Sequence, residues 1–259
     1  MSALLDLAHQ LSNARRNRCT LANGAHEPAS LDEGFFVQQA VTALCSESVT
    51  GWKVAVTTEG ETLSAPIFAA DVFASGARLP SKGRLDHGIE CELAFRLGRA
   101  LPARQAGYGN HEILDAVDGV MCSLELLQSR LTDAFRSPRP SLVADNLGNG
   151  GVVLAGARAL WRGLDLANAE ASLRIDGQEV VRARGGNPFG DPTHAVLTLV
   201  NHLCRRGVDL DAGSVAMTGS YTGVHHLLPG QHVRAEIEGF EPVELFVERE
   251  VKGVRNAGR

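Results

Sequence analysis

The stretch Ile89-Glu90-Cys91-Glu92-Leu93-Ala94-Phe95-Arg96-Leu97 decides the fold class of this chain. Its apolar side chains recur at every second position, which is the period of a β-strand and not of a helix. Glu90, Glu92 and Arg96 occupy the alternate positions. One face of this strand must therefore pack against a core, while the other carries charge.

The same kind of pattern predicts the elements on either side of this strand. Apolar residues at helical spacing predict two helices within the first 45 residues, the second one capped by Ser30. A third helix should begin at Asn110, and a longer one should follow Asp191 as N-cap and end at Gly207. Further strands are predicted over 52–56, 120–127, 152–154, 215–217, 233–237 and 243–247, with a hairpin over 173–183. Because strands outnumber helices and do not alternate with them, we expect a mixed, mainly antiparallel α+β fold and not a doubly wound sheet.

Composition excludes several classes of protein. The chain has 259 residues with 44% hydrophobic and 21% charged residues, as expected of a globular protein. A net charge of -5 argues against nucleic-acid binding, and no apolar run is long enough for a transmembrane helix. The five cysteines are scattered without a C-x-x-C pair, and the first residues lack a signal-peptide pattern. We therefore expect a reduced, cytoplasmic protein.

Three glutamates are the first candidates for chemistry. Glu90 and Glu92 point to one face of their strand, about 6–7 Å apart. They form either a solvated strand face or a pair of carboxylates held together by a cation. Glu125 lies in the apolar segment 121–127, where an unpaired carboxylate would be costly to bury. Carboxylate oxygens suit Mg²⁺ or Mn²⁺, so the three residues form a candidate metal site.

Lys53 and Asp71 are the next candidates. Lysine is rare in this chain, with 3 residues against 22 arginines, and Lys53 falls inside a predicted strand. It is either an exposed lysine on an edge strand, or a cation beside the metal ligands that binds a substrate carboxylate or relays a proton. Asp71 is a single acid in the apolar stretch 68–73, where by itself it indicates a turn.

Other polar segments carry weaker signals. Thr218-Gly219-Ser220 offers hydroxyls and backbone N–H groups that suit either anion binding or an ordinary turn at a strand end. The glycine-rich segment 145–151 lacks the Lys-Ser/Thr of a phosphate loop and the spacing of a dinucleotide fingerprint. His225-His226 has no partner at metal-ligand spacing, and we predict that it lies in a loop.

Several short motifs follow one another in a defined order along the chain. They are Gly51-Trp52-Lys53-Val54, Glu90-Cys91-Glu92-Leu93-Ala94-Phe95 running into Leu97-Gly98-Arg99, Ser123-Leu124-Glu125, Ser129-Arg130, Val143-Ala144-Asp145-Asn146, Asn187-Pro188, Arg206-Gly207, Ala212-Gly213, Met217-Thr218-Gly219-Ser220 and Pro229-Gly230. In this order they resemble the 2-oxopent-4-enoate hydratase branch of the fumarylacetoacetate hydrolase superfamily. The resemblance runs from about Gly51 to Phe246.

The resemblance implies a fold and a site. The fold is a β-rich mixed-sheet roll preceded by a small N-terminal α-helical region. We divide the chain into an N-terminal helical region with one or two strands (1–78), a β-rich catalytic domain (79–250) and a flexible tail (251–259). The implied site residues are Glu90, Glu92 and Glu125 for one Mg²⁺ or Mn²⁺, Lys53 and Asp71 for catalysis, and Ala65, Asn149, Thr218 and Ser220 for substrate binding.

The resemblance also implies an activity, which is the addition of water to a short 2-hydroxy-2,4-dienoate to give a 4-hydroxy-2-oxoacid. Decarboxylation of a 2-oxo-dienedioate and hydrolysis of an acylpyruvate stay open as alternatives on the same site, as does a non-catalytic partner subunit or small-molecule binder. Ser220 favours the hydratase, because related decarboxylases tend to have glycine there. Gln128 and the segment 147–150 depart from the hydratase pattern and leave the substrate's tail open.

Finally, the family implies a homo-oligomer, with a complex with another enzyme of the same pathway as a further expectation. The partner it implies is a small-molecule substrate, and neither nucleic acid nor membrane is expected.

Overall fold

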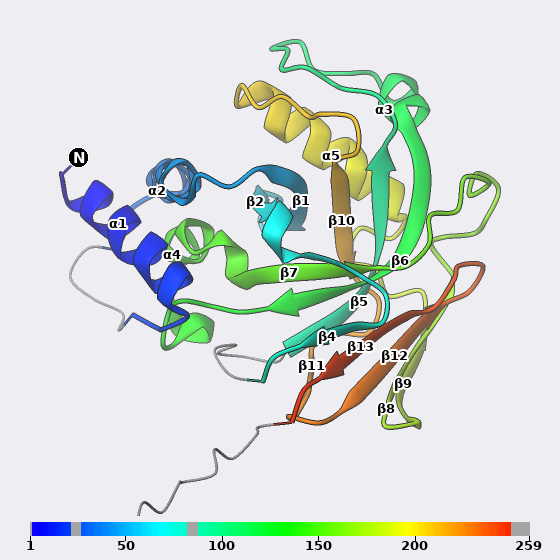
Figure 1. Cartoon of the computed structure of the whole chain (residues 1–259). Coiled ribbons are helices and arrows are strands. Elements are labelled where there is room, and N and C mark those ends of the chain that lie inside the picture. Colours follow the sequence, from blue (N-terminus) through cyan, green and yellow to red (C-terminus); the bar gives the residue numbers. More distant parts are fainter. Residues whose placement is uncertain (1, 22–26, 82–87, 250–259) are drawn as a thin grey trace, which may run out of the picture.

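The computed structural model describes residues 2–21, 27–81 and 88–249, which form a helical layer and two β-sheets (Figure 1). The predicted tail 251–259 lies outside the described residues. The helices are α1 (Ser2–Asn17), α2 (Leu31–Cys45), α3 (Asn110–Ala116), α4 (Arg139–Ala144) and α5 (Pro192–Arg205), with short 3-10 turns η1 (Ala69–Asp71), η2 (Ala134–Arg136) and η3 (Asn146–Gly148). The strands are β1 (Val49–Val56), β2 (Thr62–Phe68), β3 (Val72–Ala74), β4 (Ala77–Leu79), β5 (Gly88–Leu97), β6 (Val117–Leu127), β7 (Asn149–Leu154), β8 (Glu170–Ile175), β9 (Gln178–Arg184), β10 (Val215–Ser220), β11 (His225–His226), β12 (His232–Ile237) and β13 (Val243–Val247).

The larger sheet curls into a roll. Its strand order is β2-β1-β10-β5-β6-β7-β3, and β11 adds to one end of β5. Most neighbours are antiparallel, whereas β1 with β10 and β3 with β7 are parallel. Strand β2 also contacts β7, so the two sides of the sheet approach each other. The predicted β-rich mixed-sheet roll is confirmed.

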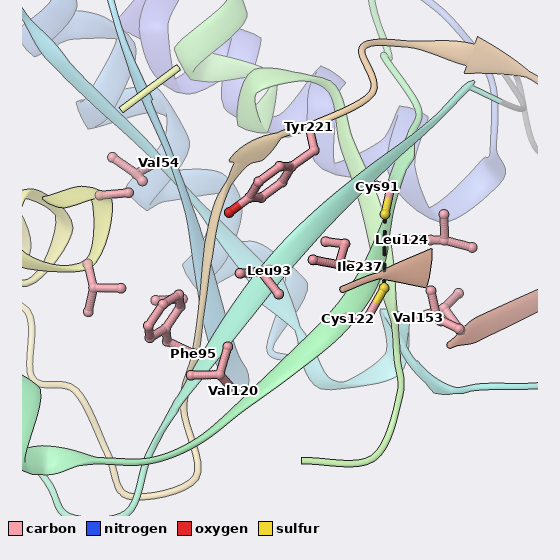
Figure 2. Close-up of a cluster of buried hydrophobic side chains, with 14 of the residues drawn as sticks. Val54, Cys91, Leu93, Phe95, Val120, Cys122, Leu124, Val153, Tyr221 and Ile237 are labelled. Carbon is pink, nitrogen blue, oxygen red and sulfur yellow. Dashed lines mark hydrogen bonds between the residues drawn. The ribbon is translucent and has the colours of Figure 1, made fainter. Parts of the chain in front are cut away.

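The main hydrophobic core lies between the larger sheet, the smaller sheet and helix α5. The smaller sheet, with order β4-β13-β12-β8-β9, and helix α5 contribute side chains to one cluster with the apolar face of β5. That face consists of Ile89, Cys91, Leu93, Phe95 and Leu97, all buried as their alternation predicts. Figure 2 shows part of this cluster, in which the sulfur atoms of Cys91 and Cys122 lie 3.9 Å apart.

The N-terminal helices form a separate small core. Helices α1, α2 and α4 pack together through Ala8, Leu11, Val37, Val41 and Ala144. The hydroxyl of Ser30 accepts a hydrogen bond from the backbone N–H of Glu33, as its role as N-cap requires. The strands within the first 79 residues do not pack as a unit with these helices, because β1, β2 and β3 join the larger sheet and β4 joins the smaller one.

Most predicted elements are present, and the differences have simple causes. The loop predicted for His225-His226 is wrong, because these two residues pair as β11 with Ile89 and Gly88 at the end of β5. Strand β2 is buried at nearly every position and shows no alternation, and α4 has only 6 residues, so neither produced a periodic pattern. No helix in the described part of the chain has both the length and the apolar character that crossing a membrane requires.

Candidate metal centre

Strand register brings the three predicted glutamates together. Glu90 and Glu92 lie on β5 and Glu125 on β6, and Glu90 faces Glu125 directly across the ladder. One carboxylate oxygen from each residue lies within 4.8 Å of the others. Glu92 and Glu125 are only 3% and 1% exposed, and Glu90 is half-buried. These three residues therefore do not form a solvated strand face.

The electrostatics of this carboxylate cluster are unfavourable without a cation. Burial raises the pKa of Glu92 well above its usual value, and the charges of Glu125 and Glu90 raise it further. Burial also raises the pKa of Glu90, with a second contribution from Glu125. Like charges directly opposite each other on neighbouring strands destabilise a sheet. A divalent cation would remove both penalties by keeping the carboxylates ionised and paired.

Hydrogen bonds satisfy only part of the carboxylate cluster. The Oε1 atom of Glu125 accepts from Asn149 Nδ2 at 2.9 Å and lies 2.6 Å from Lys53 Nζ. Glu92 Oε2 accepts from the backbone N–H of Gly219 at 2.8 Å. In contrast, Glu125 Oε2 is buried and has no hydrogen-bond partner in the described chain. This oxygen is free to act as a metal ligand.

Lys53 is a buried cation and not an edge lysine. Strand β1 lies between β2 and β10, and Lys53 is 9% exposed. Burial alone would lower the pKa of Lys53, but Glu125 and, more weakly, Glu92 and Glu90 hold that pKa above its usual value. The Nζ atom also lies 3.4 Å from the carbonyl oxygen of Leu147. Lys53 therefore stays charged and balances one of the three carboxylates.

A second buried charge pair fixes the loop that carries Leu147 and Asn149. The Arg130 guanidinium donates to Asp145 Oδ1 at 2.5 Å, to the Asp145 carbonyl at 2.6 Å and to the Asn149 carbonyl at 2.9 Å. The other carboxylate oxygen, Asp145 Oδ2, accepts from Ser129 Oγ and from the backbone N–H of Arg130. The motifs Ser129-Arg130 and Ala144-Asp145 were visible in the sequence, but their pairing was not predicted. This pair holds β7 and its preceding turn against the carboxylate cluster.

The predicted substrate-binding residues lie on strands around the carboxylate cluster. Ala65 is buried on β2 directly opposite Lys53, and Asn149 contacts Glu125. Thr218 is buried on β10, and its hydroxyl donates to the carbonyl of Leu93 at 2.8 Å. Ser220 is half-buried, and a hydrogen bond from its side chain lowers the pKa of Glu90, although burial still raises that pKa overall. The role of these four residues stays a prediction.

Asp71 pairs with an arginine of the N-terminal helix and not with the carboxylate cluster. It lies in η1 and forms an ion pair with Arg15 from α1, whose guanidinium also lies 4.1 Å from the centre of the Phe68 ring. Over the described ranges, no ion pair or hydrogen bond joins Asp71 to Lys53 or to the carboxylates. A basic end of the first helix was the only feature of Arg15 that could be predicted. A catalytic role for Asp71 stays a prediction.

A mixed-sheet roll with a buried acidic cluster at its strands defines the class of fold to which the chain belongs. The family model described as "Fumarylacetoacetate (FAA) hydrolase C-terminal" matches residues 18–248. The chain therefore belongs to the fumarylacetoacetate hydrolase family, as its motifs indicated.

The chain is similar to relatives that are named as hydratases and as decarboxylases. A segment of 167 residues is 32% identical to a 2-keto-4-pentenoate hydratase of Paraburkholderia xenovorans and covers 64% of this chain and 61% of that protein. A 4-oxalocrotonate decarboxylase of Pseudomonas sp. CF600 is 31% identical over 58% of this chain and 56% of its own length. The chain thus matches about three fifths of the length of these relatives. The predicted resemblance to the hydratase branch is confirmed, and a decarboxylase is nearly as similar.

A solved structure covers almost the whole chain. The 4-oxalocrotonate decarboxylase from Pseudomonas putida G7, complexed with magnesium and adipate, superposes with a TM-score of 0.81. It is 20% identical and covers 94% of this chain and 97% of its own. At this identity the likeness shows a shared fold.

Proposed function

We propose that this protein is a divalent-metal-dependent hydratase that adds water to a short 2-hydroxy-2,4-dienoate and forms a 4-hydroxy-2-oxoacid. The observation that carries the proposal is the set of three carboxylates, two of them buried, beside a single lysine. One buried carboxylate oxygen of this set has no hydrogen-bond partner among the described residues. Relatives named 2-keto-4-pentenoate hydratase support this choice of reaction.

The residues present fit a divalent cation. Glu90, Glu92 and Glu125 would hold Mg²⁺ or Mn²⁺, since all three offer the oxygen ligands that these ions prefer. When bound, the cation would supply Lewis-acid stabilisation of the negative charge that develops on a 2-oxoacid. Solved structures of a 4-oxalocrotonate decarboxylase complexed with magnesium and adipate, and with calcium and acetate, support this assignment.

Lys53 would bind and orient the substrate. Its buried ammonium group lies 2.6 Å from Glu125, so it can attract an incoming carboxylate and can hold or donate a proton at Nζ. Asp71, which lies in η1, would share with Lys53 the proton transfers of the reaction. Arg15 would position the Asp71 carboxylate. Ala65, Asn149, Thr218 and Ser220 would line the substrate site around these groups.

Decarboxylation of a 2-oxo-dienedioate is the second candidate. It is favoured by the relatives and the solved structure named 4-oxalocrotonate decarboxylase, and it would use the same carboxylates. The hydroxyl of Ser220 at the end of β10 favours the hydratase, because it lies next to Glu90 where a decarboxylase would have only a glycine backbone.

One experiment separates the candidates. The protein is incubated with enzymatically generated 2-hydroxypenta-2,4-dienoate and Mg²⁺ or Mn²⁺, with and without a chelator. Metal-dependent loss of the dienoate absorbance without release of CO₂ is expected. Release of CO₂ from a 2-oxo-dienedioate, with no turnover of the monoacid, would replace the hydratase with the decarboxylase. Failure to turn over either substrate would contradict both.

We also propose that the protein forms a homo-oligomer in the cytoplasm, as its composition and family resemblance suggest. Light scattering of the purified protein at several concentrations tests the first point. A single mass equal to one chain would contradict it.

A further inference from the structure

A cavity lies on the opposite side of strand β1 from the carboxylates. Its volume is about 340 Å³, and α2 and α5 form its two sides. Trp52 lines it, whereas the next residue, Lys53, reaches the carboxylates. Because successive residues of a strand point to opposite faces, the two sites are separated by the sheet itself. This cavity therefore does not belong to the proposed hydratase site.

The apolar walls of this cavity are aromatic and held in place. Phe35, Trp52 and Leu203 contribute to its lining. The Phe35 ring is 5.4 Å from the ring of His202 and lies under the Arg206 guanidinium at 3.9 Å. A volume of this size, with two aromatic walls, is typical of a site for a small planar molecule.

Polar groups inside the cavity have unused hydrogen-bonding capacity. Gln38 is 5% exposed, and its Nε2 atom donates to the carbonyls of Ser64 at 3.0 Å and Val143 at 2.8 Å. These two acceptors fix the orientation of the amide, so Oε1 points elsewhere and accepts no hydrogen bond from the described residues. Ser64 and Ser214 also line the cavity, are 1% and 8% exposed, and have hydroxyls without a partner in the described ranges. The cavity thus presents an acceptor and two hydroxyls to whatever enters it.

The charges at the rim select against anions. Asp209 and Asp211 line the cavity with one cation, Arg206. Arg206 already lies over Phe35 and 3.7 Å from Asp32, whereas Asp211 has no ion-pair partner in the described chain. The net negative charge favours a ligand that donates hydrogen bonds and carries no carboxylate.

We propose that this cavity binds a small planar aromatic molecule that carries a hydroxyl or amino donor and is neutral or cationic. The ring packs between Phe35 and Trp52, and the donor group contacts both the Oε1 atom of Gln38 and the hydroxyl of Ser64. Binding is independent of the metal, because the carboxylates lie across the sheet.

Three matched probes test this site in the full-length protein by ligand-observed NMR titration. Phenol supplies the ring and the donor, anisole removes the donor, and benzoate adds a negative charge. Saturable binding of phenol is expected, with affinity at least threefold higher than for anisole and at least tenfold higher than for benzoate. The same phenol affinity is expected with Mg²⁺ and with a chelator. Absence of saturable phenol binding, or benzoate affinity equal to that of phenol, would overturn the proposal.

Two variants locate the bound probe. Val208→Trp places a bulky ring in the lining and should abolish phenol binding, whereas Val224→Trp, at a position 43% exposed and outside the lining, should not. Ser64→Ala removes one hydroxyl from the cavity and should weaken phenol binding about threefold without affecting anisole. It also keeps the test decisive if Val208→Trp does not fold. Unchanged phenol affinity in Ser64→Ala, or in a folded Val208→Trp, would place the probe elsewhere and overturn the proposal.

Discussion

Two charge clusters lie side by side in this molecule and differ in their charge balance and in their hydrogen bonding. The pair of Arg130 and Asp145 balances one positive charge with one negative charge, and hydrogen bonds occupy both carboxylate oxygens. The cluster of Glu90, Glu92 and Glu125 has three carboxylates against Lys53 and keeps one buried oxygen that has no partner in the described part of the chain. Burial costs free energy in both places, but among the described residues only the first cluster finds partners that offset this cost. The first is therefore structural, and the second is suited to a ligand from outside.

The comparison predicts the largest effect for Glu92→Gln. Replacing one carboxylate of the cluster should abolish metal-dependent activity and the rise in melting temperature on adding Mg²⁺ or Mn²⁺, because a bound cation stabilises the native state by mass action. The metal-free protein should lose no stability, since a buried, repelled carboxylate is removed. Thermal unfolding with and without metal measures both effects.

The control for this substitution is Glu61→Gln, at an exposed position on the surface. It should behave like the unaltered protein with and without metal. A Glu92→Gln protein with a normal response to metal would mean that Glu92 is not a ligand.

In contrast to Glu92→Gln, the substitution Arg130→Met should lower the stability of the metal-free protein. Removing one partner of the balanced pair leaves Asp145, which is 2% exposed, as an uncompensated buried charge. The free energy of unfolding should fall by about 3–5 kcal/mol. Urea denaturation of the metal-free protein measures this loss.

Arg139→Met is a matched control, because Arg139 pairs with Glu59 at the surface, where ion pairs contribute little. It should leave the free energy of unfolding nearly unchanged. If Arg130→Met lowered the free energy of unfolding as little as the control does, the Arg130–Asp145 pair would not be the stabilising cluster of the two.

Asn149 connects the two clusters and gives an intermediate prediction. Its side chain donates to Glu125, while its carbonyl accepts from Arg130. Asn149→Ala removes only the first contact, so metal affinity should fall by about 10- to 100-fold, as is usual for residues that orient a metal ligand. Calorimetric titration with Mn²⁺ measures the affinity. An unchanged affinity, or a loss of stability as large as that of Arg130→Met, would contradict this division of roles.

The smallest effect concerns His202, a single half-buried histidine outside both clusters. Burial, helped by the charges of Arg206 and Arg205, lowers the pKa of His202 to about 4, and its Nε2 atom is buried without a partner in the described chain. The unfolded chain should have the ordinary value of about 6.5 and so binds the proton first as pH falls. The contribution to stability is present above about pH 6.5 and is lost between that pH and about pH 4.

In His202→Gln this acid-dependent loss should be smaller than in the unaltered protein, as measured by urea denaturation between pH 7 and pH 4. Adding metal should leave the difference unchanged, because His202 lies outside the carboxylate cluster. An identical pH dependence in both proteins would contradict the assignment.

Local sequence pattern predicted a large part of the fold and of the site. The alternation from Ile89 to Leu97 predicted a strand with one apolar face and two carboxylates on the other, and β5 has this form. Asp191 was predicted as the N-cap of α5. In the structure its carboxylate accepts a hydrogen bond from the backbone N–H of Thr193. Both depend on neighbours within a few residues, so no tertiary information was needed.

Other features needed contacts that are remote in sequence. Lys53 and Glu125 meet because β1 and β6 belong to the same rolled sheet, and the sequence left open whether Lys53 lies at an edge. The two histidines of β11 form a strand only because the end of β5 offers a partner. The pairing of Asp71 with Arg15 joins η1 to α1 across 56 residues and was not predicted.

The sequence by itself therefore determined the residue types, the strand periods and the family to which the chain belongs. Only the tertiary structure decided that three carboxylates meet below the exposed surface, that Lys53 balances one of them, and that the Arg130–Asp145 pair holds Asn149 beside them. The physical reason is that side-chain period is a local property of the backbone. Burial and charge balance, in contrast, depend on which strands become neighbours.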